Sequence, residues 1–295
     1  MPERYWFEAE LHSLIGAFVN PFTALDYQVT VGRFPFALQN NLLMNDENLG
    51  LAINKNNLYF GPLSNLNIQL FYGFNDVSTF SNSDAQLYGA TAFADYHNEF
   101  WEANYAFIKN ELDSTRDAHY AAASRTKLYG PTTVALRALF KWGDRGGSGS
   151  GQLFVVESNR TRLFESRPLG VEKGVFYCNA FLATKGWNSI AGSNFNRLTT
   201  TFEVDPLVQI ATGRTTGEIW GASLGVQLFR HHEDESLIPE FAFQAPNGEP
   251  AWGFGLRYLR KTGRRSFFEA LGVFSDSNDA RFKREGVFLS ETILF

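Results

Sequence analysis

Hydrophobic and polar positions alternate with a period of two along most of this chain. Residues 66–74 read LNIQLFYGF, and one face of that segment carries Leu66, Ile68, Leu70, Tyr72 and Phe74. The same alternation recurs in 132–142, 218–228 and 251–258. Successive side chains of a strand point to opposite faces, so the pattern predicts β-strands with one apolar face and one polar or small face.

This periodicity predicts an all-β fold of fifteen strands in a single domain that spans 1–295. The expected strands are 5–19, 26–34, 50–60, 66–74, 85–96, 99–110, 117–127, 130–142, 151–160, 173–184, 216–229, 237–245, 251–260, 265–274 and 283–295. Most run about 9–12 residues, which is longer than the usual strand and enough to cross a bilayer at a tilt.

The connections between these strands alternate in length. One side carries mostly short connections, at 20–25, 61–65, 97–98, 128–129, 230–236 and 261–264, with 161–172 as the longer exception. The other side carries 35–49, 75–84, 143–150, 185–215 and 275–282, with shorter ones at 111–116 and 246–250. Short periplasmic turns and long external loops alternate in this way in outer-membrane barrels. A Greek-key sandwich would not sort its loops so regularly.

Aromatic residues gather near the ends of the predicted strands. Tyr88 and Tyr96 flank an alanine-rich face, and Trp252 and Tyr258 flank Phe254. Two interfacial girdles of rings are typical of transmembrane barrels. Packing of the rings in the core of a soluble sandwich or small barrel is the alternative.

The chain ends on GVFLSETILF, residues 286–295, an apolar strand-like run. A final strand that ends in an aromatic residue resembles the carboxyl-terminal signature of bacterial outer-membrane proteins. That resemblance implies that Phe295 is a signal for the assembly machinery. We expect this strand to pair with the first one, because an open edge cannot face lipid. Glu291 departs from the pattern, so it lies low in the barrel or the register is bulged.

Composition narrows the function classes. The 295 residues carry a net charge of −5, which gives no nucleic-acid footprint. The single Cys178 shares the apolar face of its strand with Phe176 and is expected to act as a small hydrophobic residue. Mean hydropathy is −0.21, and no apolar run approaches the length of a transmembrane helix.

The amino terminus, MPERYWFEAELHS, carries no recognisable signal peptide. Fifteen strands would also place the two termini at opposite ends of the barrel, whereas bacterial single-chain barrels have an even number. We therefore expect about 16 strands, with one or more amino-terminal strands missing from this chain. A wrongly assigned hairpin is the alternative explanation.

Three stretches carry a family resemblance. They resemble segments of alginate-export-like, porin-type outer-membrane proteins. The stretches are VGRFPFALQNNLLMNDENLGLAI at 31–53, IWGASLGVQLF at 219–229 with ESLIPEFAF at 235–243, and WGFGLRYLRKTGRRSFFEALGVF at 252–274. The resemblance implies a porin-like barrel and names no substrate.

Candidate chemistry does not favour an enzyme. His231 and His232 stand among acidic residues on a predicted turn, and such a cluster is more often solvated than metal-bound. The stretch DRGGSGSG at 144–151 lacks the Lys-Ser/Thr of a phosphate-binding loop. We expect no catalytic site, no metal and no cofactor.

The sequence therefore predicts a porin or facilitated-diffusion channel of the bacterial outer membrane for small hydrophilic solutes, with the lipid bilayer and the assembly machinery as further partners. The residues expected to line the pore are Arg137, Lys141, Arg257, Glu102 and Glu240. The segment 185–215 is a candidate constriction loop, through Glu203, Asp205 and Arg214. The arginines favour a weak preference for anions. A soluble carbohydrate-binding sandwich or barrel is the alternative, and a docking barrel with a plugged lumen is a third possibility.

Overall fold

The structure is a computed structural model that describes residues 4–15, 27–74, 85–111, 114–143, 149–166, 170–191, 198 and 217–294. Its strands are β1 (Tyr5–Glu10), β2 (Tyr27–Leu38), β3 (Met44–Leu58), β4 (Asn65–Gly73), β5 (Ala85–Tyr96), β6 (Glu99–Asn110), β7 (Ala118–Tyr129), β8 (Thr132–Gly143), β9 (Gly151–Leu163), β10 (Val171–Ala183), β11 (Ile219–Arg230), β12 (Glu235–Pro246), β13 (Ala251–Gly263), β14 (Ser266–Ser277) and β15 (Arg284–Ile293). The short helices are α1 (Leu11–Ile15), η2 (Ser114–Arg116) and η6 (Ala280–Phe282). None of these described helices is long and apolar enough to span a membrane.

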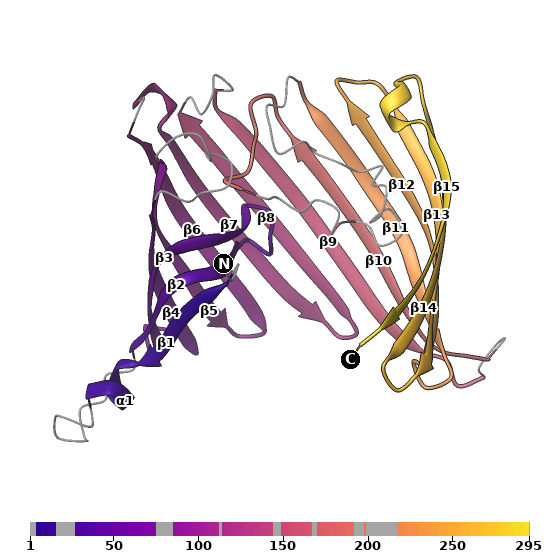
Figure 1. Cartoon of the computed structure of the whole chain (residues 1–295), viewed down its shortest axis with the longest axis horizontal. Helices are drawn as coiled ribbons and strands as arrows, with labels where there is room; N and C mark the ends of the chain where they lie inside the picture. The colour runs from indigo at the N-terminus through magenta and orange to yellow at the C-terminus, as the bar shows by residue number, and fades with distance from the viewer. Residues whose placement is uncertain are drawn as a thin grey trace.

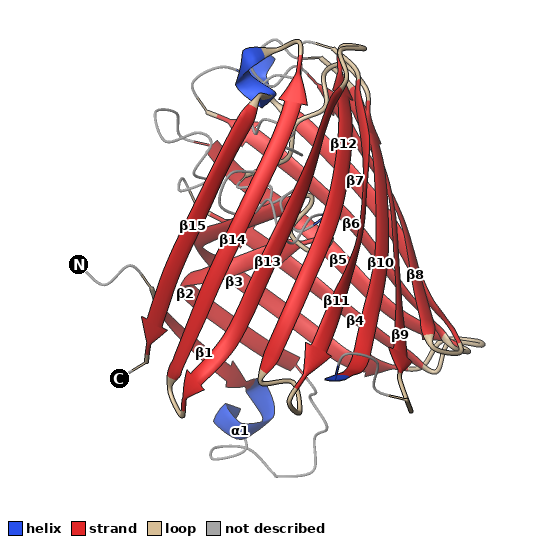
Figure 2. Cartoon of the chain, turned by 90° about the vertical axis from the view of Figure 1, so that its right-hand side faces the viewer, coloured by secondary structure: helices blue, strands red, loops and turns tan. Residues whose placement is uncertain are grey.

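The fifteen strands form one antiparallel sheet in which each strand pairs with its neighbours in the sequence. The sheet curls into a tilted, barrel-like wall around a central space (Figure 1; Figure 2). Each predicted strand has a counterpart, so the predicted all-β antiparallel barrel fold is confirmed. The largest differences are at the first strand, which gives way to α1 at Leu11, and in the predicted loop 35–49.

The prediction that the last strand pairs with the first is wrong for the described residues. The strand order begins at β1 and ends at β15, with no pairing between the two. Figure 1 shows the gap between these edges at the front of the barrel. Because strands alternate in direction, strands one and fifteen run the same way. An antiparallel join between them therefore requires an odd number of further strands.

The outward face of the sheet carries exposed rings. Five register-paired rings on β4–β8 form a continuous outer row of Tyr72, Tyr88, Phe107, His119 and Trp142. Neighbouring ring centroids in this row lie 4.5–6.4 Å apart. On the outer face of β6, Lys109 and Glu99 bracket an otherwise uncharged stretch. Ten residues at ~3.3 Å each, tilted by about 40°, span ~25 Å, which matches the apolar band of an outer-membrane barrel.

Cys178 and Glu291 both lie on the outer face of the sheet. Cys178 is exposed and lies on the same face as Phe176, as predicted. Glu291 accepts a hydrogen bond of 2.7 Å from the Thr262 hydroxyl, beside the β13–β14 turn. The carboxylate therefore lies low in the barrel, at the level of a short turn, where a charge costs less than at the membrane midplane.

The inner face carries the core, which is concentrated toward the end with the long connections. Figure 1 shows β2 and β3 turning into the barrel at this end instead of continuing along the wall. The predicted loop 35–49 is mostly strand: β2 and β3 stay register-paired to Leu38 and Met44, so only 39–43 form the connection. Their apolar residues explain the inward turn, because Phe34, Phe36 and Leu38 alternate on one face and are buried.

Candidate functional site in the barrel lumen

The tip of the β2–β3 hairpin lies against the inner face of β6. Gln39 is fully buried, and its backbone N–H donates to the Glu102 carboxylate at 3.0 Å. Its side-chain amide donates to Asn104 on β6. Leu42 and Leu43 are also fully buried. Left-handed backbone at Gln39, Asn40 and Asn41 makes the turn, a conformation that asparagine tolerates better than most residues.

A second segment, 184–191, packs on this tip. Ile190 N–H donates to the Leu43 carbonyl at 2.9 Å, and Asn45 N–H donates to the Ala191 carbonyl at 3.0 Å. Trp187 is fully buried, and its backbone passes so close to Gly151 that a Cβ there would lie 2.1 Å from the Trp187 nitrogen. The tip of the β2–β3 hairpin and the segment 184–191 together form a plug, which we define as residues 39–44 and 184–191.

Glu102 and Arg137, two of the predicted pore-lining residues, both contact the plug. Glu102 binds the backbone of Gln39, and the Arg137 guanidinium lies 3.5 Å from the Gln39 side-chain oxygen. Arg137 is also paired with Glu157 at 2.6 Å, and both side chains are largely buried. Arg137 is thus neutralised by a neighbouring carboxylate on the inner wall.

The other three predicted pore-lining residues also lie on the inner face. Lys141 is 2% exposed and donates to the Gly186 carbonyl at 3.2 Å, which ties the wall to the plug. Arg257 pairs with Glu269 at 2.7 Å. Glu240 is buried and register-paired with glycines on both neighbouring strands. Their inward position does not test a role in conduction, so pore lining stays a prediction.

The candidate constriction loop is described only in part. Residues 185–191 belong to the plug, and Leu198 is buried with its carbonyl bound by Asn179 at 2.9 Å and by Ser223. Glu203, Asp205 and Arg214 lie outside the described residues, as does Phe295, so the roles predicted for them stay predictions. Sequence reasoning missed the contribution of the β2–β3 hairpin to the constriction, although the alternation of apolar residues at 34–38 was an available signal.

The lumen opens toward the end with the short turns. A cavity of about 770 Å³ lies there, lined by Ser64, Asp95, His97, Asn98, Glu99, Phe100, Thr126, Leu128 and Gly130. Phe100 is 41% exposed although it lies on the inner face of β6, opposite the exposed Trp101. The interior is therefore filled at one end and accessible at the other.

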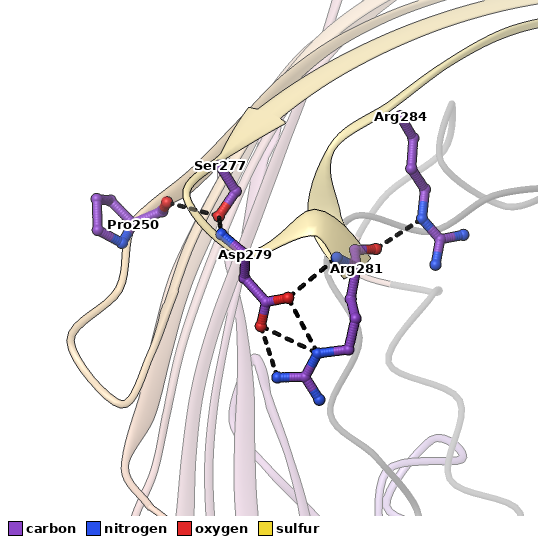
Figure 3. Close-up of polar contacts among 5 residues, drawn as sticks. All are labelled: Pro250, Ser277, Asp279, Arg281 and Arg284. Carbon is purple, nitrogen blue, oxygen red and sulfur yellow. Dashed lines mark hydrogen bonds and ion pairs between the residues drawn. The ribbon is translucent and has the colours of Figure 1, made fainter.

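A compact loop stands at the rim of the long-connection end. Figure 3 shows Asp279 accepting from the backbone N–H of Arg281 at 3.0 Å and from its guanidinium. Ser277 donates to the Pro250 carbonyl at 3.0 Å, and Arg284 donates to the Arg281 carbonyl at 2.8 Å. The bonds from Arg281 hold the pKa of the Asp279 carboxyl below its ordinary value of 3.8. This network stiffens the β14–β15 connection.

The histidine pair lies on a turn, as predicted. His231 and His232 both have left-handed backbone in the β11–β12 turn, and the His232 N–H donates to Glu172 at 3.0 Å. Across the described residues, no group of three or more His, Cys, Asp or Glu side chains could hold a metal ion. The expectation that the chain is not an enzyme stays a prediction.

Comparison with known proteins gives similarities to solved structures. No protein-family model and no curated protein matches the sequence. Among solved structures, Wzi of Escherichia coli is similar, with a TM-score of 0.55, 10% sequence identity, and coverage of 91% of this chain and 67% of Wzi. Wzi is described as an outer-membrane protein involved in group 1 capsule assembly and as a carbohydrate-binding β-barrel.

At this identity the similarity concerns the fold. The fold is that of an outer-membrane β-barrel, and the predicted location in the bacterial outer membrane agrees with it. The alginate-export-like group is not confirmed, so that finer assignment stays a prediction.

Proposed function

We propose that this chain is an outer-membrane barrel that binds carbohydrate and does not form a permanently open diffusion channel. The observation that carries the proposal is the plug, whose Gln39, Leu42 and Leu43 are fully buried inside the barrel. A plug packed inside the barrel argues against free diffusion through the lumen, and the similar barrel of Wzi is described as carbohydrate-binding.

Ligand-binding surfaces in proteins combine aromatic or apolar groups with a few placed polar groups. The lumen below the plug offers both, since Phe100 is exposed and stands beside Asp95 and Thr126 on the inner wall. We propose the lipid bilayer as the environment of the outer face, because that face presents rings and aliphatic side chains along most strands.

Two measurements on detergent-purified protein test this proposal. Single-channel recording in planar bilayers should give no steady conductance, because the plug closes the lumen. An array of neutral, N-acetylated and acidic oligosaccharides should show binding to the same preparation. A steady open channel, or no binding to any glycan on the array, would overturn the proposal.

The second candidate is the predicted channel for small hydrophilic, including anionic, solutes. It is favoured by the inward position of Arg137, Lys141 and Arg257, and it requires the plug to leave the lumen. Conductance that appears only with a solute present would support this second candidate over the first.

A further inference from the structure

A row of polar side chains crosses the inner face of β2–β6. The register pairs are Gln28 with Asn54, Asn54 with Gln69, Gln69 with Thr91, and Thr91 with Asn104. Directly opposed residues of antiparallel strands lie on the same face. Four strand spacings of ~4.8 Å make this amide row ~19 Å long.

One end of the amide row is closed by the plug, and the other is accessible. Asn104 and Thr91 are buried, and the Asn104 amide donates to the Thr91 hydroxyl at 2.9 Å. Gln39 of the plug binds Asn104 as well. Gln28, Asn54 and Gln69 are only half-buried. The accessible part of the row therefore faces the lumen below the plug.

The Gln28 amide nitrogen donates to Glu8, and beyond that bond the accessible amides have spare hydrogen-bonding capacity. Each amide carries two N–H donors and an oxygen with two lone pairs. The Asn54 amide reaches the Gln28 oxygen only at 3.5 Å, the outer limit for such a bond. Within the described part of the chain, the Gln69 amide has no hydrogen-bond partner. Half-buried amides with unused donors and acceptors are suited to a ligand rich in hydroxyl groups.

Two rings flank the amide row on the side of the short turns. Phe93 and Phe100 lie on the same inner face, with ring centroids 6.0 Å apart and planes at 22°. The exposed face of Phe100 offers an apolar platform beside donors and acceptors. A sugar has the matching pattern, with hydroxyls at its edge and C–H groups on its faces.

The charge of this wall selects among sugars. Glu8, Asp95 and Glu102 lie on the inner face of β1, β5 and β6. None of the described inner-face residues of β1–β6 is Lys or Arg. These carboxylates accept hydrogen bonds from Gln28, Asn65 and the Gln39 backbone, which do not neutralise their charge, so they repel acidic ligands at short range. The wall therefore suits a neutral or amino-bearing saccharide over an acidic one.

We propose that Gln28, Asn54 and Gln69, with Phe100, form a binding site for an extended neutral or amino-bearing saccharide that enters from the short-turn end. The site rests on the proposed carbohydrate-binding function and gives it a location and a ligand class. Its length fits an oligosaccharide better than a single sugar, because the binding groups are spread over several strands.

The test compares the full chain with a triple variant in the same detergent. Gln28→Met, Asn54→Leu and Gln69→Met keep the side-chain size and remove the amides. The control is Gln86→Met with Gln152→Met, two amides on the outer face near the long connections. Affinity for the best array glycan should fall at least tenfold in the triple variant and less than twofold in the control.

Each outcome decides one point. Binding by the wild type that the triple variant retains would overturn this site and leave the proposed function standing. An array on which acidic glycans bind best would also overturn it. No binding by the wild type would overturn the proposed function itself.

A second measurement applies if the triple variant does not show the heat-modifiable mobility of a folded barrel. Gln69→Cys with Cys178→Ser places one thiol in the amide row. The bound glycan should slow labelling of that thiol by a water-soluble reagent severalfold. An unchanged labelling rate at saturating glycan would contradict the site.

Discussion

The two ends of the lumen differ along the very same strands. On the inner face of β6, Ile108 is fully buried and Phe100 is 41% exposed. On β9, Leu153 is fully buried at the long-connection end, whereas Asn159 near the short turns is exposed. The strand pattern alone does not create this difference, because the inner face alternates in the same way throughout. The plug creates it by filling one end.

The largest expected effect is that removal of the hairpin part of the plug makes the long-connection end of the lumen as accessible as the short-turn end. Replacing 36–46 by Asn-Gly would join Pro35 to Glu47, which are directly paired in register. Asn-Gly is the preferred two-residue hairpin turn. We expect steady conductance in planar bilayers where the wild type gives none. As a control, Asn-Gly in place of 247–250, on the rim, should give no conductance. If the variant with the shortened β2–β3 hairpin also gives none, the hairpin is not the barrier.

The packed end should lose stability when its largest side chain is truncated. Trp187→Ala removes a fully buried ring, and such changes typically cost about 3–5 kcal/mol. Trp220→Ala removes a ring that is 47% exposed on the outer face and should cost clearly less. Urea unfolding gives the free energy of unfolding of both variants. It is followed by gel mobility, because a fluorescence signal would change with the loss of a tryptophan. Equal losses would mean that the plug is not packed as described.

A smaller effect concerns the ion pairs of the inner wall. In the hairpin-shortened protein, Arg137→Ala with Arg257→Ala would remove the positive charges that pair with Glu157 and Glu269. The lumen would become more negative, so the reversal potential in a salt gradient should shift toward cation preference, most at low salt. Arg125→Ala, on the outer face, is the control and should cause no shift. An unchanged potential in the double variant would exclude these arginines from the conducting path.

The smallest expected effect is at the rim. Arg281 lowers the Asp279 pKa, so the order that this bond gives the 278–283 loop is present at neutral pH. This order is lost as the pH falls below the ordinary carboxyl pKa of 3.8 and through the lower pKa that Asp279 has in the folded protein. Amide exchange of the loop, corrected for its intrinsic rate, should rise severalfold on acidification. Asp279→Asn should exchange faster at pH 7 and respond less to acid; a wild-type response in this variant would assign the transition to another group.

The wall of the barrel could be predicted from the sequence, because strand periodicity is a local signal. The alternation around Leu66–Phe74 or Trp252–Tyr258 depends only on which face meets lipid. The inward position of Arg137 and Glu102 follows from the same alternation. For Glu291, the cost of a charge facing lipid predicted either a position low in the barrel or a bulged register, and the structure has the low position.

The contents of the lumen could not be predicted in the same way. The β2–β3 hairpin reads as a polar loop because QNN and NDEN surround Leu42 and Leu43. Its inward turn depends on contacts with Glu102 and Ile190, which are distant in the sequence. The amide row could not be predicted either. Each of its residues is an ordinary polar position on the inner face of its strand, and the row forms only through the pairing register of five strands.

The two unpaired edges limit how this sheet can exist in a membrane. Edge strands expose backbone N–H and C=O groups, each of which costs several kcal/mol when left unbonded in hydrocarbon. Since β1 and β15 run in the same direction, they cannot be zipped to each other as antiparallel neighbours. Two added strands would run parallel to one of the two edges, whereas one or three added strands would pair antiparallel with both edges. Any polypeptide that completes this wall with antiparallel pairing throughout must therefore add an odd number of strands.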